Sequence, residues 1–345
     1  MKSSVTGRRL LAGLAIAATG VALVGCSSAS AEPDAEGMTA VTINQAVPTI
    51  FYLPLYVAEA QGFFEENGVD MTLDTAGSGS GAFAAVLGGS ADFSVQDPVF
   101  VPKSLQSGGE GVVVAGIHDQ PSMFIVGSDE TDLQGNLDYL EGKKVIVSPE
   151  PDTSWAYMTY LIEQNDLEDV ELVNVALGAE LAAVASGQAD YAVAGAQTIV
   201  QGIEEEGLHQ VYSFASDESL SPFAFSSLTS TQSYIDENPE AALGVVTALE
   251  QADRFIYENP EETIDIAIAE FPDLDPEVVR ATVQSMIDGD GFPRTTLVSE
   301  DAWEHNMEVA AFIGNVDGYP SESTSYEASV NAELANEAAS AVDAG

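Results

Sequence analysis

The residues best placed for chemistry fall in turns that follow predicted strands and precede predicted helices. The stretch from Val41 to Gly62 sets this pattern: a strand ends near Gln45 and a helix begins near Leu53. Such a turn offers a ligand the free N–H groups and the positive dipole end of the helix. The candidate ligand contacts in corresponding turns, with one at the end of a buried strand, are Thr49, Gly79, Ser80, Gln96, Asp97, His118, Asp152, Thr153, Ser154 and Gln197.

Five aromatic residues lie in or beside these turns, and one or two of them could stack on a planar ligand: Phe51, Tyr52, Phe83, Trp155 and Tyr157. The alternative is that they pack in the core. Trp155 is the strongest candidate because it follows three polar residues at a predicted helix start. Two of these, Asp152 and Ser154, are also ordinary N-cap residues, so both capping and ligand contact are open for them.

Gln96 and Gln197 end corresponding strands, and paired amides facing across a cleft would recognise neutral donors and acceptors. The alternative is a pair of exposed loop glutamines. Asp97 could bind a cationic or N–H-rich ligand, or it could cap the helix that Pro98 begins. The basic residues fall within predicted helices, at edges or in the helical tail, so an anion would depend on helix N-termini and hydroxyls. A neutral or heteroaromatic ligand is at least as compatible with this pattern.

Residue types needed for catalysis or metal binding are scarce. The three histidines, His118, His209 and His305, have no metal-binding spacing such as H-x-x-x-H, and Cys26 is the single cysteine. The sequence suggests no Ser-His-Asp or Cys-His constellation. From these residues we expect no enzyme active site, no cofactor and no metal.

The first 25 residues resemble the signal of a bacterial lipoprotein. Lys2, Arg8 and Arg9 precede an apolar run, which ends in a lipobox-like Leu-Val-Gly-Cys at Cys26. The resemblance implies cleavage before Cys26 and lipid on its sulfur. An ordinary signal peptide, a single membrane helix or a twin-arginine export signal are the alternatives. Residues 26–39 are small and polar, which predicts a flexible tether.

The charge of the chain is strongly acidic, with 56 Asp and Glu residues against nine Lys and Arg residues. Three of the nine lie in the signal, so the mature chain carries six and a net charge near −50. Such a surface repels nucleic acid and anionic membranes. Hydrophobic residues make up 46% of the chain, too many for simple disorder, so we predict a folded, halophilic protein whose carboxylates are screened at high salt.

Strands alternate with helices from Val41 to Phe214, which predicts an α/β fold with largely parallel sheets. The sequence AVLGGSADFSV at 85–95 recurs as AVASGQADYAV at 183–193. Each copy reads as a helix end, a glycine cap, a turn and a strand. Two lobes built on one plan would give this repeat, although chance similarity would also. Beyond Phe223 the sequence predicts mainly helices.

Several segments together resemble the solute-binding proteins of ABC importers, and more narrowly the nitrate, sulfonate, taurine and thiamine-pyrimidine binding family. They are LPLYVAEAQGFFEENGVDMTL at 53–73, GGSADF at 88–93, LEGKKVIVS at 140–148, ASGQADYAV at 185–193 and ENPE at 237 and 258. The resemblance implies a two-lobed periplasmic-binding-protein type II fold. Lobe one would hold residues 40–120 and 222–345, and lobe two residues 121–221.

The same resemblance implies a monomer held outside the cytoplasm by its lipid anchor, with an ABC permease and its ATPase as partners and a small molecule as substrate. A ligand-sensing lipoprotein or an enzyme similar to the thiamine-pyrimidine synthase is the alternative. Many family members have an acidic or tryptophan-rich sequence where this chain has Gly195-Ala196-Gln197. The resemblance therefore leaves the substrate open.

Overall fold

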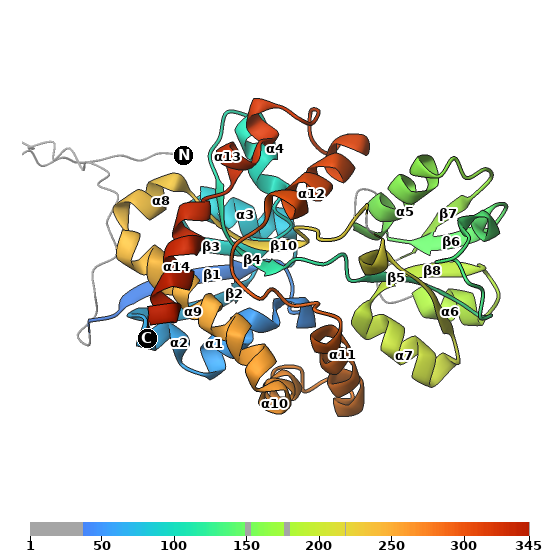
Figure 1. Ribbon diagram of the computed structural model, residues 1–345, viewed down its shortest axis with the longest axis horizontal. Coiled ribbons are helices and arrows are strands. Elements are labelled where there is room, and N and C mark those ends of the chain that lie inside the picture. Colours follow the sequence, from blue (N-terminus) through green and yellow to red (C-terminus); the bar gives the residue numbers. More distant parts are fainter. Residues whose placement is uncertain (1–36, 149–152, 176–179, 218, 345) are drawn as a thin grey trace, which may run out of the picture. The chain divides into compact units, whose positions relative to one another are not determined.

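The computed structural model describes residues 37–148, 153–175, 180–217 and 219–344, which form two five-stranded sheets flanked by helices (Figure 1). Both sheets belong to one compact unit, Ala31–Gly345. Cys26 and Asp152, two residues singled out from the sequence, lie outside the described residues, as does the side chain of Gln197.

The first sheet has the strand order β2 (Val69–Thr75), β1 (Thr39–Gln45), β3 (Phe93–Gln96), β10 (Ser226–Ser230) and β4 (Val112–His118). β1 runs parallel to β2 and β3, whereas β10 runs antiparallel to both of its neighbours. The expectation of mainly helices beyond Phe223 is confirmed, because the later elements are mainly helices, but it did not include β10. The β10 sequence, SSLTS, has a single apolar residue and therefore no hydrophobic alternation.

Hydroxyl hydrogen bonds allow β10 to be buried in spite of its polarity. The hydroxyls of Ser94 and Thr229 lie 2.9 Å apart, and the Ser230 hydroxyl donates to the carbonyl of Asp92 at 2.7 Å. A buried hydroxyl without a partner would cost about 1–3 kcal/mol. These pairs let a serine-rich strand occupy an inner position between β3 and β4.

The second sheet has the strand order β7 (Glu171–Asn174), β6 (Lys144–Val147), β8 (Tyr191–Gly195), β5 (Met123–Gly127) and β9 (His209–Ser213). β6 runs parallel to β7 and β8, and β5 runs antiparallel to β8 and β9. In each sheet one strand therefore runs against its neighbours, and the prediction of mostly parallel sheets in an α/β fold is confirmed.

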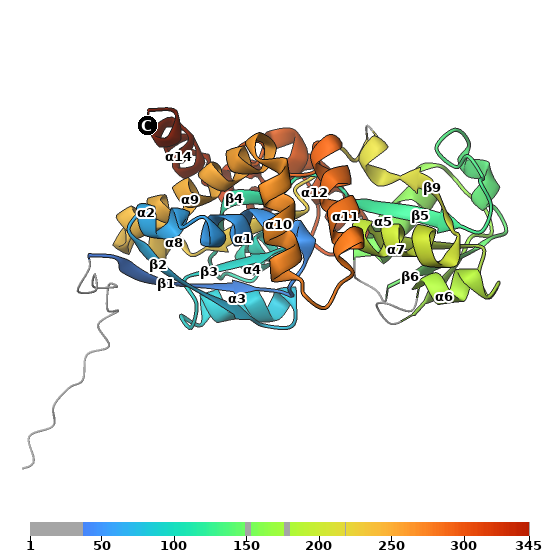
Figure 2. The ribbon, with the colours of Figure 1, turned by 90° about the horizontal axis from the view of Figure 1, so that it is seen from below.

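Helices cover both sheets, and Figure 2 shows them from a second direction. With the first sheet lie α1 (Leu53–Ala60), α2 (Phe63–Glu66), α3 (Gly79–Leu87), α4 (Phe100–Gln106), α8 (Gln232–Glu237), α9 (Pro239–Glu258), α10 (Pro260–Glu270), α11 (Pro276–Asp288), α12 (Glu300–Phe312), α13 (Tyr326–Ser329) and α14 (Ala332–Ala344). With the second sheet lie α5 (Thr153–Gln164), α6 (Glu180–Ala185) and α7 (Ala196–Glu206). Single 3-10 turns are η1 (Ile50–Tyr52), η2 (Leu137–Leu140), η3 (Phe214–Ser216) and η4 (Glu322–Thr324).

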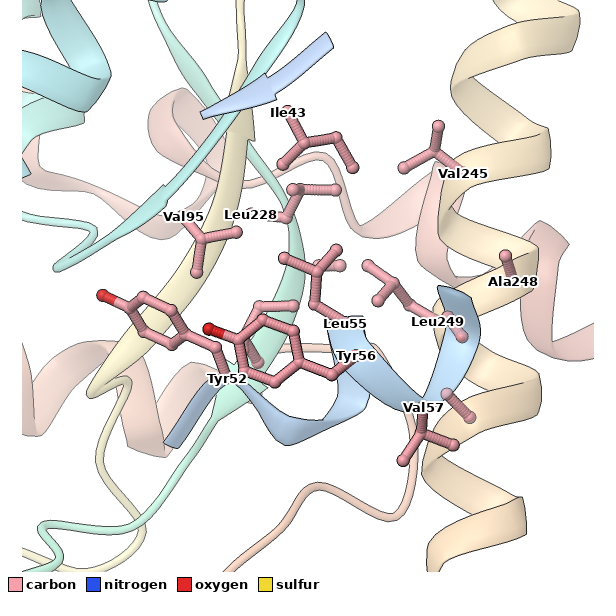
Figure 3. Packing of buried hydrophobic residues seen from close by; sticks show 14 of the residues in the cluster. Ile43, Tyr52, Leu55, Tyr56, Val57, Val95, Leu228, Val245, Ala248 and Leu249 are labelled. Atoms are coloured by element: carbon pink, nitrogen blue, oxygen red, sulfur yellow. The ribbon is translucent and has the colours of Figure 1, made fainter. Parts of the chain in front are cut away.

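The main core lies between the first sheet, α1 and α9. Figure 3 shows Leu55 and Tyr56 of α1 among strand residues such as Val95 and helix residues such as Leu249. Leu55 and Leu249 are fully buried. Each leucine of this kind contributes about 1.5–3 kcal/mol relative to an exposed position. This packing fixes α1, and with it the turn that precedes α1.

The turn between β1 and α1 is also held by polar contacts. The buried hydroxyl of Tyr56 donates to Oε1 of Gln45 at 2.5 Å, and the amide N–H of Thr49 donates back to that hydroxyl at 3.4 Å. Pro54 lies in the first turn of α1, as expected from the sequence. A helix and a strand end are thus tied together across the turn.

The internal repeat of the sequence has a counterpart in the hydrogen bonds. Asp92 accepts from the amide of Thr42 in the first sheet at 2.8 Å, and Asp190 accepts from the amide of Lys144 in the second sheet at 2.9 Å. The two aspartates are 98 positions apart in the sequence. Asp92 directly precedes β3 and Asp190 directly precedes β8, the central strands of the two sheets. The same side chain therefore performs the same structural task in both sheets.

Two connections link the sheets, from β4 to β5 and from β9 to β10. They are hydrogen-bonded to each other, because the amides of Phe223 and Phe225 donate to the carbonyls of Asp119 and His118 at 2.7 and 3.0 Å. The two connections between the sheets therefore lie side by side.

Candidate functional site

A small cavity of about 30 Å³ is walled by elements from both sheets. Asp97 and Val99 follow β3, whereas Thr153, Ala156 and Tyr157 come from α5 beside the second sheet. The other described lining residues are Phe223, Phe225, Asn306, Val309, Ala310, Ile313 and Asn315. A volume of this size has room for about one or two water molecules. The polar groups that the described residues bring to it can be followed one by one.

Asp97 has two differently engaged oxygens. Its Oδ1 accepts from the amide of Val99 at 2.9 Å and from Nδ2 of Asn306 at 3.3 Å. No described residue donates a hydrogen bond to Oδ2. Burial raises the pKa of Asp97 to about 6, although the hydrogen bonds from Val99 and Asn306 and the charge of Lys103 oppose the rise. One oxygen thus holds the turn before α4. The capping interpretation was wrong, because α4 begins at Phe100 with Val99 as its N-cap residue and has no side-chain capping bond. The other oxygen accepts no hydrogen bond from a described residue.

Tyr157 brings a phenol to the same cavity from α5. Its ring is buried, and its hydroxyl has no hydrogen-bond partner among the described residues. Burial and the nearby Asp97 raise the pKa of this phenol, so it stays protonated. Tyr157 was one of the five aromatic residues considered for stacking on a ligand, but Trp155 was preferred. Tyr157 lies four residues after Thr153, on the same helix face.

Trp155 lies elsewhere on α5. Its side chain is partly buried and packs against the core of the second sheet. Ser154 is buried and its hydroxyl accepts from the amide of Ser148 at 2.8 Å. Among the described residues of this predicted group, Thr153 alone lines the cavity.

A cluster of aromatic rings lies where the two connections leave the first sheet. Phe51 stacks on His118 with ring centroids 5.0 Å apart, and Phe225 lies edge-on to both. The Phe51 ring also reaches β8, because a Cβ added to Gly195 would lie 3.2 Å from its Cζ. Phe51 therefore contacts residues of both sheets.

His118 is fully buried in this cluster. Its Nε2 lies 2.8 Å from the hydroxyl of Ser122, and its Nδ1 has no partner among the described residues. Burial lowers the pKa of His118 to about 3, so the ring is neutral at physiological pH.

Residues 51–263 match the family model described as NMT1/THI5 like. The chain belongs to this family. YtlA of Bacillus subtilis (strain 168), which carries the name of a binding protein, is 25% identical over 313 residues, covering 88% of this chain and 91% of YtlA. The family resemblance seen in the sequence is thereby confirmed.

Solved structures share the fold of this NMT1/THI5-like protein. The periplasmic aliphatic sulphonate binding protein SsuA from Escherichia coli has a TM-score of 0.66 at 16% identity, over 80% of this chain and 92% of SsuA. The periplasmic nitrate-binding protein NrtA from Synechocystis PCC 6803 has a TM-score of 0.64 at 16% identity, over 89% of this chain and 90% of NrtA. The predicted periplasmic-binding-protein fold is confirmed by these likenesses.

Gln96 and Tyr52 are buried beside the cavity of this NMT1/THI5-like protein. Nε2 of Gln96 donates to the hydroxyl of Thr229 at 2.8 Å, while its Oε1 has no partner among the described residues. Burial raises the pKa of Tyr52, a hydrogen bond with Ser226 opposes the rise, and Asp97 adds to it. Gln96 is thus a buried strand residue, so the exposed-loop alternative was wrong for it.

The remaining predicted residues serve the turns in which they lie. Oγ1 of Thr49 accepts from the amide of Phe51 at 3.4 Å and so caps η1. Ser80 is exposed in the first turn of α3. A side chain at Gly79 would collide with Phe100, because a Cβ there would lie 2.9 Å from the ring. None of these three residues lines the cavity.

Lys103 is the basic residue that comes near the cavity. Its Nζ donates to Oδ1 of Asn315, a lining residue, at 2.6 Å. The sequence placed Lys103 inside a helix, and the structure shows that its amine reaches the cavity wall from there. The other described lysines and arginines all form ion pairs with acidic residues; they are Lys143, Lys144, Arg254, Arg280 and Arg294. The guanidinium of Arg294 also lies over the ring of Tyr257.

A larger groove of about 480 Å³ lies beside β9, with His209, Ile203 and Glu130 in its wall. None of the predicted site residues lines it. Within the described ranges, no group of three or more His, Cys, Asp or Glu side chains is arranged to hold a metal ion. No helix of that same part is both long and apolar enough to cross a membrane.

Proposed function

We propose that this protein is an extracytoplasmic solute-binding protein that captures a small molecule and delivers it to an ABC importer. The single observation that carries the proposal is the cavity walled by both sheets. Among the described residues, none donates to Oδ2 of Asp97 and none pairs with the hydroxyl of Tyr157. Membership of the family supports it, as do the printed functions of SsuA and NrtA as binding proteins. Their substrates make a sulfonate or nitrate possible, and a thiamine-pyrimidine-like compound is a further candidate.

The two lobes are proposed to comprise residues 40–120 with 222–345, and residues 121–221. The strand order supports this division, because β5 to β9 form the second sheet and the other five strands form the first sheet. A cavity of 30 Å³ is far smaller than the roughly 300–1,000 Å³ of ordinary ligand sites. Ligand entry therefore requires the walls to separate, and contacts to both walls would then favour the closed form.

Binding at this site is proposed to involve Asp97, Thr153 and Tyr157, with Phe51 and His118 at the adjoining connections. No catalytic step is proposed. The three histidines do not complete a catalytic triad among the described residues. His118 contacts the hydroxyl of Ser122 through Nε2, but no described carboxylate meets its Nδ1. His209 pairs with Glu130, and His305 contacts the carbonyl of Pro222.

Anchoring through lipid on Cys26 is part of the proposal, because the mature protein must stay near the permease. Its support is the sequence alone: a basic start, an apolar run and the Leu-Val-Gly-Cys ending. Mass spectrometry of the purified chain should show an N-terminal acylated cysteine, and Cys26→Ser should release the protein from the membrane fraction.

A thermal-shift screen in high salt tests the binding function. The panel holds nitrate, bicarbonate, taurine, alkanesulfonates, thiamine, its hydroxymethylpyrimidine and riboflavin. A ligand that binds only the folded state raises the Tm by mass action. We expect a shift with one compound class that is lost when Tyr157 is replaced by Ala and kept when the exposed Asp74 is replaced by Asn.

A further inference from the structure

We infer that the ligand presents an N–H donor, as an ammonium or an amino group, to Oδ2 of Asp97. The inference rests on the proposed function and narrows it to a class of substrate. It assigns Asp97 as the specificity-determining residue of the site.

The two carboxylate oxygens of Asp97 differ in their hydrogen bonds. Oδ1 of Asp97 already accepts two hydrogen bonds, from Val99 and Asn306, which fix the orientation of the group. Oδ2 is left with no donor among the described residues, in a residue that lines the cavity. An oriented carboxylate oxygen without a donor is the partner that a ligand N–H group requires, and a charge-assisted hydrogen bond there is shorter and stronger than a neutral one.

The wall of the cavity also contains donors of the protein itself. Nδ2 of Asn306 is occupied, because it donates to Asp97 and to the carbonyl of Ala224 at 2.7 Å. The Tyr157 hydroxyl can either donate or accept. Thr153 and Asn315 also line the cavity and carry groups that can donate, but Asp97 is the one charged side chain among the described lining residues. A bare anion would therefore face a carboxylate at close range.

Positive charge near the cavity comes from Lys103 and from the start of a helix. The amine of Lys103 reaches Asn315 and not the carboxylate of Asp97, to which no described cation is ion-paired. The start of α5, at Thr153, lies in the cavity wall and favours an acceptor on another part of the ligand. A molecule with a donor at one end and an acceptor at the other fits both features, whereas nitrate or a simple sulfonate fits one of them.

Matched ligand pairs test the inference by calorimetry on the full chain, purified in detergent and high salt. One pair is taurine and ethanesulfonate, and the other is 4-amino-5-hydroxymethyl-2-methylpyrimidine and its 4-hydroxy analogue. Within at least one pair, the amino compound should bind about tenfold or more tightly. Asp97→Asn should abolish this preference, and Asp74→Asn on exposed β2 should keep it. The affinity of wild-type protein should rise from pH 5 to pH 7, as Asp97 ionises.

Three results would overturn the inference. If ethanesulfonate or nitrate binds as tightly as the amino compounds, the substrate class is wrong, although the solute-binding function stands. If Asp97→Asn keeps the preference for the amino compound, Asp97 does not determine specificity. If none of these compounds binds but a panel compound without an N–H donor does, the inference is contradicted and the solute-binding function stands. Should Asp97→Asn fail to fold, Tyr157→Phe is the second variant, because it removes only one oxygen atom. It is expected to lower the affinity for the amino compound several-fold.

Discussion

The phenyl ring of Phe51 lies nearly parallel to the imidazole of His118, with centroids 5.0 Å apart and planes at 23°. His118 is the last residue of β4, where the first connection leaves the first sheet. Phe225, at the end of the second connection, packs edge-on against both rings. The side chain of Phe51, just before α1, therefore contacts both connections between the sheets. It also contacts Gly195 at the end of β8.

The contact between Phe51 and Gly195 can be tested by adding one methyl group. Gly195 has φ of −75°, so its backbone accepts alanine without strain, but the new Cβ would lie 3.2 Å from Phe51 Cζ. We expect Gly195→Ala to destabilise the protein by about 1 kcal/mol through overpacking and to weaken ligand binding several-fold. Chemical unfolding and calorimetry measure the two effects. The double variant with Phe51→Leu should recover most of both losses, and additive losses would contradict this account.

His118 should make stability depend on pH. Its folded-state pKa of about 3 is below its ordinary value of 6.5, so the unfolded chain binds the proton more readily. The contribution of His118 is fully present above pH 6.5 and is lost as pH falls toward 3. The free energy of unfolding of wild type minus that of His118→Asn should therefore rise from pH 4.5 to pH 7, by about 2 kcal/mol. A difference that stays constant with pH would show that the imidazole is not desolvated as described.

Asp253 should behave in the opposite way. It is fully buried in α9, and both of its carboxyl oxygens have no hydrogen-bond partner among the described residues. Burial raises the pKa of this carboxyl well above its ordinary value, and Glu250 and Asp119 raise it further. Its cost to folding therefore appears as pH rises above 3.8 and grows toward the folded-state pKa.

Replacing Asp253 by Asn removes the ionisation and keeps the shape. The variant should gain stability over wild type between pH 4 and pH 7, by about 1–3 kcal/mol at pH 7. Urea unfolding at several pH values measures the gain, with Asp273→Asn on the exposed surface as control. A variant that is less stable at pH 7 would indicate that the ionised carboxylate has a bound partner.

Salt should stabilise the mature protein, because its net charge is near −50 and exposed like charges repel each other. We expect the Tm to rise by several degrees or more from dilute buffer to molar potassium chloride. Scanning calorimetry across this range measures the change. A Tm that does not move with salt would exclude the high-salt adaptation proposed from the composition.

Most strands and helices could be predicted because their apolar residues follow a clear period. The alternation of strands and helices from Val41 to Phe214 was predicted correctly, and the repeat containing Asp92 and Asp190 correctly indicated equivalent turns. β10 could not be predicted in this way, since its burial depends on hydroxyl pairs with β3 that only the folded sheet creates.

The candidate site was predicted only in part. Asp97 could be found because it follows a strand and precedes Pro98. Tyr157 was considered for stacking but ranked below Trp155, because a turn pattern locates a helix start but does not show which helix face meets the partner sheet. Asn306 comes from α12, 209 residues after Asp97. No local pattern connects two such positions, so their pairing depends on tertiary packing.

Hydrogen exchange with and without ligand tests the central claim most directly. The probe is the compound that raises the Tm most in the screen. We predict slower exchange in three segments that wall the cavity: the turn around Asp97 to Val99, the start of α5, and Phe223 to Phe225. Protection of segments from both sheets would support capture between them. Protection confined to one sheet, or to the groove beside β9, would contradict the account.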